Sequence, residues 1–229
     1  MTVPQQVLRR ADRVLLDFDG PVCAAFTTIT DGRIAEALRR YLHQQGHTPA
    51  EELSATAEPL DVLAYAAGVS PELAVAVEAE LTRWECHAVR YAEPTPALRD
   101  VLAWLTDSER SVTIVSNNAT SAIKTYLHNA DLTAFVSGVA ARTPDNIRRL
   151  KPDPYLLRQV VSAHETAPDR YVMIGDSPAD IQAAHKLGVP SIAYSAKPGE
   201  PGGEEQLADN NPTAIIHHMN ELLPDDAAQ

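Results

Sequence analysis

The 229-residue sequence predicts an α/β fold, in which a parallel sheet core is flanked by helices and a helical domain is inserted after the first strand. Short apolar runs alternate with helical stretches, which is typical of a parallel sheet covered on both faces. Residues 32–92 interrupt that alternation because they look helical throughout. We therefore expect a Rossmann-like core of residues 1–21 and 93–229, and a helical cap of residues 22–92 with hinges near 21–31 and 92–96.

The strands of the core are expected where apolar runs stop at polar or turn-forming residues. These runs are residues 13–18, 111–115, 171–174 and 191–194, with a weak strand near 134–137 and an edge strand at 214–216. Helices are expected at 96–107, at 119–129, after the loop at 151–154 as far as about 164, and at 178–187 before Gly188. Residues 197–212 predict a loop because they are rich in Pro, Gly, Asn and acids, and the last few residues are expected to fray.

The inserted segment shows apolar residues at helical spacing, including Ile34, Leu38 and Leu42. Ser70 and Pro71 form a helix start, with a capping serine before a proline in the first turn. That helix is expected to run from Pro71 to about Arg90.

Composition and charge limit the classes of partner and the cellular location that can be expected for the chain. A formal charge of −12 disfavours nucleic acid, because phosphate backbones would be repelled over most of the surface. No stretch approaches the roughly 20 apolar residues that span a bilayer, and the first ten residues do not resemble a signal peptide. Cys23 and Cys86 fit no disulfide or zinc pattern, which favours a cytoplasmic location. The oligomeric state is not predicted.

Polar residues gather where three of the apolar runs end. Asp17 and Asp19 follow the first run, Ser116 and Asn117 the second, and Asp176 the third. In an open parallel sheet these ends form one crevice, the usual ligand site. Each motif alone has an ordinary explanation, such as a solvated loop or a helix cap, but their occurrence in this order is hard to explain by chance.

These residue types supply the parts of a phosphoryl transfer. An aspartate carboxylate can attack phosphorus, and a second carboxyl can protonate the leaving oxygen. Ser116 and its loop N–H groups could bind phosphoryl oxygens, and Lys151 could neutralise charge there. Asp176 with Asp17 offers the oxygen ligands that Mg²⁺ prefers. The partner expected is a small phosphorylated metabolite.

Four segments together resemble the motifs of the haloacid dehalogenase superfamily, in the order that the superfamily has them. They are residues 17–22, 114–117, 151–154 and 174–180, and the resemblance covers about residues 13–195. The helical insert looks like the cap of the phosphoglycolate phosphatase-like branch. Asp19 favours phosphoryl chemistry, because the dehalogenases of the superfamily lack an acid there. Pro21 departs from the threonine of many relatives, and we expect altered loop rigidity or cap motion from it.

The resemblance implies roles for single residues. Asp17 would be the nucleophile and a magnesium ligand, and Asp19 the general acid and base, with its backbone carbonyl also on the metal. Ser116, Asn117 and Lys151 would hold the phosphoryl group, and Asp176 would complete the metal site. Asp180 would orient a metal-bound water or Lys151, or be a solvated acid in the first helical turn.

The predicted function is a magnesium-dependent phosphatase that forms a phospho-aspartate, and three alternatives stay open. A phosphomutase uses the same residues. A phosphonate hydrolase normally has a cap lysine, whereas the lysines here are Lys124, Lys151, Lys186 and Lys197. A non-catalytic protein that binds phosphorylated ligands need not keep both the nucleophile and the acid.

Specificity would come from side chains around the phosphoryl site. The candidates are Cys23 and Phe26 after the nucleophile loop, Arg33, Arg83 and Arg90 in the cap, and Arg142 and Asn146 before Lys151. For Cys23 the favoured interpretation is a small buried apolar residue, and for the cap arginines it is a solvated surface.

Overall fold

The computed structural model describes residues 1–48, 53, 55–196 and 203–224. A six-stranded sheet runs through it in the order β3-β2-β1-β4-β5-β6, with every pair of neighbours parallel. The strands are β1 (Arg13–Leu16), β2 (Ser111–Ala119), β3 (Gly138–Arg142), β4 (Tyr171–Gly175), β5 (Ser191–Tyr194) and β6 (Ala214–Ile216). The chain moves outward from β1 in one direction to β3 and then returns to β4 on its other side. This reversal beside β1 is where ligands bind in open α/β sheets.

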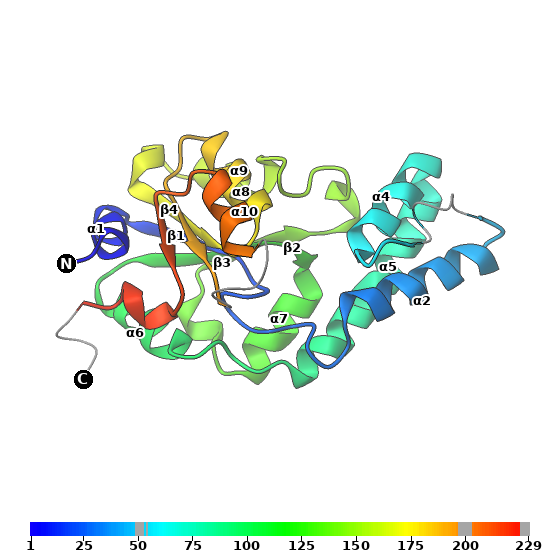
Figure 1. Cartoon of the computed structure of the whole chain (residues 1–229), viewed down its shortest axis with the longest axis horizontal. Helices are drawn as coiled ribbons and strands as arrows, with labels where there is room; N and C mark the ends of the chain where they lie inside the picture. Colours follow the sequence, from blue (N-terminus) through cyan, green and yellow to red (C-terminus); the bar gives the residue numbers. More distant parts are fainter. Residues whose placement is uncertain (49–52, 54, 197–202, 225–229) are drawn as a thin grey trace.

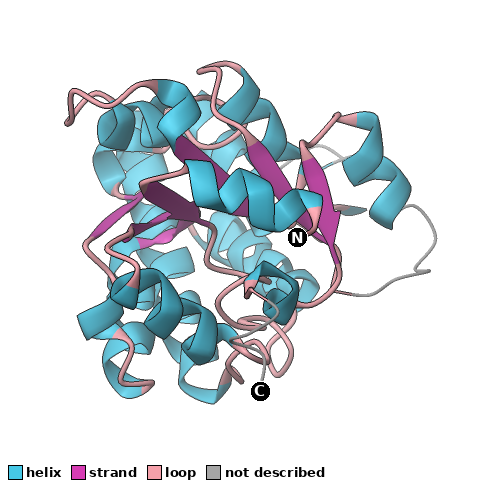
Figure 2. Ribbon diagram, turned by 90° about the vertical axis from the view of Figure 1, so that its left-hand side faces the viewer, coloured by secondary structure: helices cyan, strands magenta, loops and turns pink. Residues whose placement is uncertain are grey.

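Helices cover both faces of the sheet, as Figures 1 and 2 show. One face packs on α1 (Val3–Arg10), α6 (Leu98–Asp107), α7 (Thr120–Asn129) and the 3₁₀ turn η5 (Met219–Leu222). The other packs on α8 (Tyr155–Val161) and α9 (Pro178–His185). Successive strand side chains point to opposite faces, so Val14 and Leu16 lie in the first core and Leu15 in the second. The predicted fold class is confirmed.

The insert between β1 and β2 contains α2 (Asp31–Gln44), α4 (Pro59–Val69) and α5 (Pro71–Ala88), which lie beyond the end of the sheet in Figure 1. Its helices share a separate apolar core that includes Ile34, Leu38 and Leu81. The hydroxyl of Ser70 accepts a hydrogen bond from the backbone N–H of Leu73 at 3.1 Å, which confirms the predicted start of α5. After Ala88 the chain continues as the 3₁₀ turn η1 (Val89–Tyr91).

The weak strand predicted at 134–137 is wrong. Residues Thr133–Phe135 form the 3₁₀ turn η2, and β3 begins at Gly138, which pairs with Thr113 of β2. Residues 134–137 contain Phe and Val, which favour strands, whereas β3 reads Gly-Val-Ala-Ala-Arg. Pairing with β2 therefore outweighs local propensity at this position.

The loop predicted at 197–212 is also wrong in part, because α10 covers Gly203–Asp209. Leu207 is buried against Ile181 of α9 and Ala193 of β5, and acids in the first turn suit a helix N-terminus. Residues 197–202 and the predicted frayed end at 225–229 lie outside the described residues. The helix predicted to reach about 164 ends at Val161. None of the helices in the described ranges is long and apolar enough to cross a membrane.

Candidate active site

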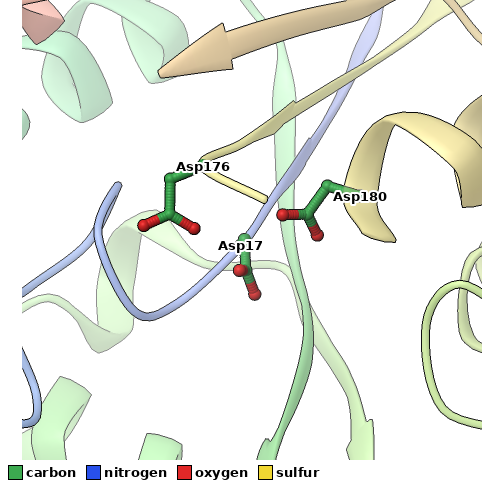
Figure 3. A group of neighbouring side chains, drawn as sticks. All are labelled: Asp17, Asp176 and Asp180. Carbon is green, nitrogen blue, oxygen red and sulfur yellow. The ribbon is translucent and has the colours of Figure 1, made fainter. Parts of the chain in front are cut away.

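The carboxyl end of β1 aims Asp17 toward α8 and α9. Asp17 directly follows the strand and continues its alternation, so its side chain lies on the same side as Leu15, while Phe18 packs in the opposite core. The backbone N–H of Asp17 donates to the carbonyl of Ile174 in β4 at 2.8 Å, which holds the two strand ends together. Figure 3 shows the carboxylates of Asp17, Asp176 and Asp180 arriving from β1, from the end of β4 and from α9.

Lys151 is buried against these carboxylates. Its ammonium nitrogen lies 2.8 Å from Oδ1 of Asp17, forms a close ion pair with Asp180, and donates to the carbonyl of Val115 at 2.9 Å. Burial alone would lower the pKa of Lys151, but the charges of Asp17 and Asp180 outweigh it and raise this pKa well above its usual value. Lys151 therefore stays cationic at the floor of the site.

The two site residues predicted on β2, Ser116 and Asn117, make different contacts. The hydroxyl of Ser116, which is almost fully buried, donates to the side-chain carbonyl of Asn118 at 3.0 Å. The Asn117 side chain donates to the carbonyl of Lys151 at 2.9 Å and accepts from its N–H at 2.8 Å. Both amide atoms of Asn117 thus contact the backbone of Lys151, so this side chain positions Lys151, and the contact of Asn117 with a phosphoryl group stays a prediction.

Asp180 is fully buried, which rules out the solvated-acid interpretation. Its Oδ1 pairs with Lys151, and its Oδ2 accepts from the hydroxyl of Ser177 at 2.7 Å and from the Ser177 N–H at 3.1 Å. A Cβ atom on Gly175 would lie 2.4 Å from Cγ of Asp180, so only glycine leaves room for this carboxylate. Sequence reasoning missed Gly175, although glycine inside a buried strand signals a close approach.

Asp19 is oriented by the segment that leads into the insert. The N–H of Ala25 donates to Oδ1 of Asp19 at 2.8 Å. Thr95, on the segment that returns from the insert, donates to the carbonyl of Gly20 at 2.6 Å. Burial raises the pKa of Asp19, the N–H groups of Ala25 and Gly20 lower it, and the charge of Glu85 raises it, with a net rise. Asp19 is thus an acid that holds its proton more tightly than an ordinary aspartic acid.

Three carboxylates of the site lie close enough together to hold a metal ion. Oxygens of Asp17, Asp176 and Asp180 lie within 4.8 Å of one another. Burial, then the charge of Asp180, raises the pKa of Asp17 to about 6 even though Lys151 opposes this rise. Asp176 keeps an exposed surface, yet the surrounding protein partly removes its carboxylate from water. This desolvation and the neighbouring charges raise its pKa well above the usual value. Since Lys151 and Ser177 already hold Asp180, the donors left for a hard cation are Asp17 and Asp176.

No arginine is among the described residues that line the cavity over Asp17, so the arginines proposed for specificity do not contact this site. Arg33, Arg83 and Arg90 are exposed. Arg142 is fully buried and pairs with two carboxylates of α5, at 2.7 Å from Glu85 and 3.3 Å from Glu78. It thereby joins the insert to the end of β3.

Two other specificity candidates, Asn146 and Cys23, stabilise the fold instead of lining the site. The Asn146 side chain caps a turn through the N–H of Thr143 and the carbonyl of Ala141. Cys23 is buried in the core, as its favoured interpretation predicts. Phe26 does line the site, as expected of a pocket residue.

A cavity of about 220 Å³ opens above Asp17, between the sheet edge and the insert. Its floor contains the predicted residues Asp17, Asp19, Ser116, Asn117, Lys151 and Asp176. Its roof comes from the insert and includes Asp31, Glu58, Leu81 and Glu85. A second cavity of about 740 Å³ reaches Asp19 and Asp176 from the opposite side, along the two segments that join the insert to the core.

Comparison with known proteins agrees with this geometry. The sequence model of the family described as haloacid dehalogenase-like hydrolase matches residues 14–194. A phosphoglycolate phosphatase from Salmonella choleraesuis (strain SC-B67) is 32% identical over 131 residues, which make up 56% of this chain and 49% of the relative. The chain spans about half the length of the curated relatives it matches.

Solved structures share the fold at low sequence identity. A structure described as a predicted phosphatase from Clostridium acetobutylicum has a TM-score of 0.68 at 19% identity, over 92% of this chain and 95% of the other. CbbY from Rhodobacter sphaeroides, solved in complex with phosphate, has a TM-score of 0.67 at 14% identity, over 95% and 99% of the two chains. At such identities the likeness shows the fold alone.

Proposed function

The chain belongs to the haloacid dehalogenase-like hydrolase family, and from this premise we propose that it is a magnesium-dependent phosphatase acting on a small phosphate monoester through a phosphoryl group on Asp17. The observation that carries the proposal is the ion pair between Asp17 and the buried Lys151 at the edge of the cavity, with Asp19 beside them. An activated carboxylate, a fixed cation and a proton-holding acid are what transfer of a phosphoryl group to aspartate requires.

In the first half-reaction a carboxylate oxygen of Asp17 attacks phosphorus while the bond from phosphorus to the leaving oxygen breaks. Asp19 gives its proton to that oxygen, so the alcohol leaves neutral. The raised pKa of Asp19 supports this role, because a general acid must still hold its proton near the working pH. The Ala25 N–H fixes one oxygen of Asp19.

In the second half-reaction Asp19, now ionised, takes a proton from water. The water oxygen attacks phosphorus, the bond between phosphorus and the Asp17 oxygen breaks, and inorganic phosphate leaves. Lys151 neutralises charge on the transferring group throughout, and Ser116 lines the same cavity. Asp180 and Asn117 act through Lys151, the first on its ammonium group and the second on its backbone.

The residues that would hold Mg²⁺ are Asp17, Asp176 and the backbone carbonyl of Asp19. Crowded carboxylates with raised pKa values fit a divalent cation, because binding it relieves their mutual repulsion. When bound, the ion supplies positive charge that stabilises the transferring phosphoryl group. The insert, residues 22–92, would act as a cap that covers the cavity and excludes water, over a core of residues 1–21 and 93–229.

Turnover of 4-nitrophenyl phosphate tests the proposal. We expect phosphate release with Mg²⁺, loss of turnover with a chelator, and its return when Mg²⁺ is added in excess. Asp17→Asn should abolish turnover while the circular dichroism spectrum stays unchanged. Turnover without metal, or by the Asn variant, would assign the reaction to other groups. Net release of phosphate also separates a phosphatase from a phosphomutase, which conserves the phosphoryl group.

A further inference from the structure

The roof of the 220 Å³ cavity faces a leaving group that stays within this cavity. Its volume is below the roughly 300–1,000 Å³ of sites for drug-sized ligands, so it suits a phosphoryl group with a small leaving group, whereas a larger one would extend into the 740 Å³ cavity that shares Asp19 and Asp176. One ligand-binding feature is visible at the floor of the smaller cavity. Oδ1 of the buried Asp17 has no hydrogen-bond donor in suitable geometry, although Lys151 lies 2.8 Å away as an ion-pair partner. The floor is thus built to receive a group, and the roof faces whatever is attached to it.

The described part of the roof is acidic and lacks a cation. Asp31 begins α2, Glu58 precedes α4, and Glu85 lies on α5, while Phe26, Pro59, Leu60 and Leu81 add apolar surface. Lys151 is the one cation among all the described lining residues, and Asp17 and Asp180 already hold it.

The three roof carboxylates differ in how well their charge is balanced. Glu85 is paired with Arg142 and also accepts from the N–H of Ala119 at 2.8 Å. Asp31 and Glu58 form no ion pair with any residue in the described ranges. Both stand at helix N-termini, which favour acids, but a helix end is equivalent to about half a charge and a carboxylate carries a full one. Burial and then the charges of Asp19, Glu58 and Glu85 raise the pKa of Asp31 to about 7, so Asp31 is mainly ionised only above neutral pH. Above that pH both carboxylates line the roof, and its described residues include no cation to balance them.

We propose that Asp31 and Glu58 are specificity-determining residues that select a phosphate monoester whose leaving group carries an ammonium group, and that they disfavour a leaving group with a carboxylate. This inference rests on the phosphatase activity proposed above. An ammonium group only donates hydrogen bonds and carries the opposite charge, so it matches two unpaired acids. A carboxylate would face like charges, and the described residues of the insert that line the cavity include no cation to offset them. The substrate class thus differs from phosphoglycolate, whose leaving group is anionic.

Three monoesters of matched size provide the test: 2-aminoethyl phosphate, 2-hydroxyethyl phosphate and 2-phosphoglycolate. Each is measured for kcat/KM at about pH 8, above the pKa of Asp31, with 4-nitrophenyl phosphate as a reference substrate. We expect the ammonium ester to exceed the carboxylate ester by about tenfold or more, with the hydroxyl ester between them. The double variant Asp31→Asn with Glu58→Gln should bring the ammonium and carboxylate esters within about threefold of each other.

A matched control is Glu36→Gln, an exposed acid on α2 that lines none of the cavities described above, and this variant should keep the parent ratio. The thermal unfolding midpoint of each variant shows whether the starts of α2 and α4 are still stable. A purely structural effect would lower kcat/KM for all three esters together. Three outcomes would overturn the inference, provided that 4-nitrophenyl phosphate is hydrolysed. They are equal kcat/KM values for the hydroxyl and ammonium esters, a preference for the carboxylate ester, and no turnover of any of the three. If 4-nitrophenyl phosphate is not hydrolysed either, the proposed function itself fails.

Discussion

Gly20 and Asp176 share one small space: a Cβ atom on Gly20 would lie 2.1 Å from Oδ2 of Asp176. Gly20 also has a φ of +87°, a backbone conformation that residues with a side chain rarely adopt. The turn after Asp19 can therefore close against the Asp176 carboxylate only because residue 20 has no side chain. Its carbonyl is held from the other side by Thr95.

Gly20→Ala should accordingly damage the metal site. We expect the added methyl group to displace Asp176, so that much more Mg²⁺ is needed for half-maximal activity, and to cost about 1–2 kcal/mol of stability from the backbone alone. Gly46→Ala is the control, because Gly46 has a φ of +83° but no atom of the described residues lies within 4 Å of its Cβ position. That variant should lose stability and keep the Mg²⁺ dependence. An unchanged Mg²⁺ titration in Gly20→Ala would contradict the account.

Arg142 should be needed for stability rather than for substrate. Arg142→Ala leaves Glu78 and Glu85 buried without a cation, and breaking such a pair costs about 3–5 kcal/mol. The free energy of unfolding in urea measures this loss. Arg83→Ala removes an exposed pair with Glu80 and should cost about 1 kcal/mol or less. Equal losses in the two variants would show that the buried pairs contribute little.

The unfolding free energy of the chelated protein should fall as pH rises through the window set by Asp17. Folding raises the pKa of Asp17 from 3.8 to about 6, mainly by burial, so between these values the folded state binds more protons than the unfolded state. The contribution that protonated Asp17 makes to the free energy of unfolding is fully present below about pH 4 and is progressively lost as pH rises through about 6. Asp17→Asn removes the loss, so at pH 7 the chelated variant should have a free energy of unfolding higher than that of the chelated parent by on the order of 3 kcal/mol.

Measuring unfolding at pH 4 and pH 7, with chelator and with Mg²⁺, checks the sign. At pH 4 the difference between variant and parent should shrink. Mg²⁺ should stabilise the parent more than the variant, since the ion would bind the ionised carboxylate. A variant that is less stable than the chelated parent at pH 7 would mean that Lys151 stabilises the Asp17 charge more than burial destabilises it.

Removal of the acid should affect poor leaving groups most. Asp19→Asn cannot protonate the leaving oxygen, so an alkyl phosphate should lose about 10²-fold or more in kcat/KM, while 4-nitrophenyl phosphate, whose leaving group departs readily as an anion, should lose less. The comparison uses kcat/KM because this quantity reports the steps up to departure of the leaving group and leaves out the later hydrolysis of the phospho-aspartate, which is common to both substrates. The readout is the ratio of the two losses. Equal losses would assign Asp19 a role in positioning rather than in proton transfer.

Much of this fold could be predicted because hydrophobic patterning determines it. The runs that became β1, β4 and β5 are apolar, end at polar residues and are buried as expected. By contrast, β3 is Gly-Val-Ala-Ala-Arg, and only its pairing with β2 makes it a strand. Likewise α10 depends on burial of Leu207 in a contact that local composition does not reveal.

The candidate site also combines features that the sequence predicts with features that depend on tertiary packing. Strand ends and chain order bring Asp17, Ser116, Lys151 and Asp176 to one cavity, as the sequence predicts. The sequence did not indicate that Asn117 would contact the Lys151 backbone or that Arg142 would face α5. Both depend on how the insert and the loops pack, and polar side chains of these types suit a surface equally well. Asp31 and Glu58 resemble ordinary acids at helix starts, so their place in the roof emerges only in three dimensions.

The most direct measurement of the central claim is chemical trapping of the intermediate. The protein is quenched in acid during turnover with Mg²⁺ and substrate, treated with borohydride, and digested for peptide mass spectrometry. Borohydride reduces an acyl phosphate to an alcohol, so a phosphoryl group on Asp17 predicts homoserine at position 17, and none when substrate is omitted. Homoserine at another aspartate, or unmodified Asp17 under conditions of steady turnover, would contradict the account.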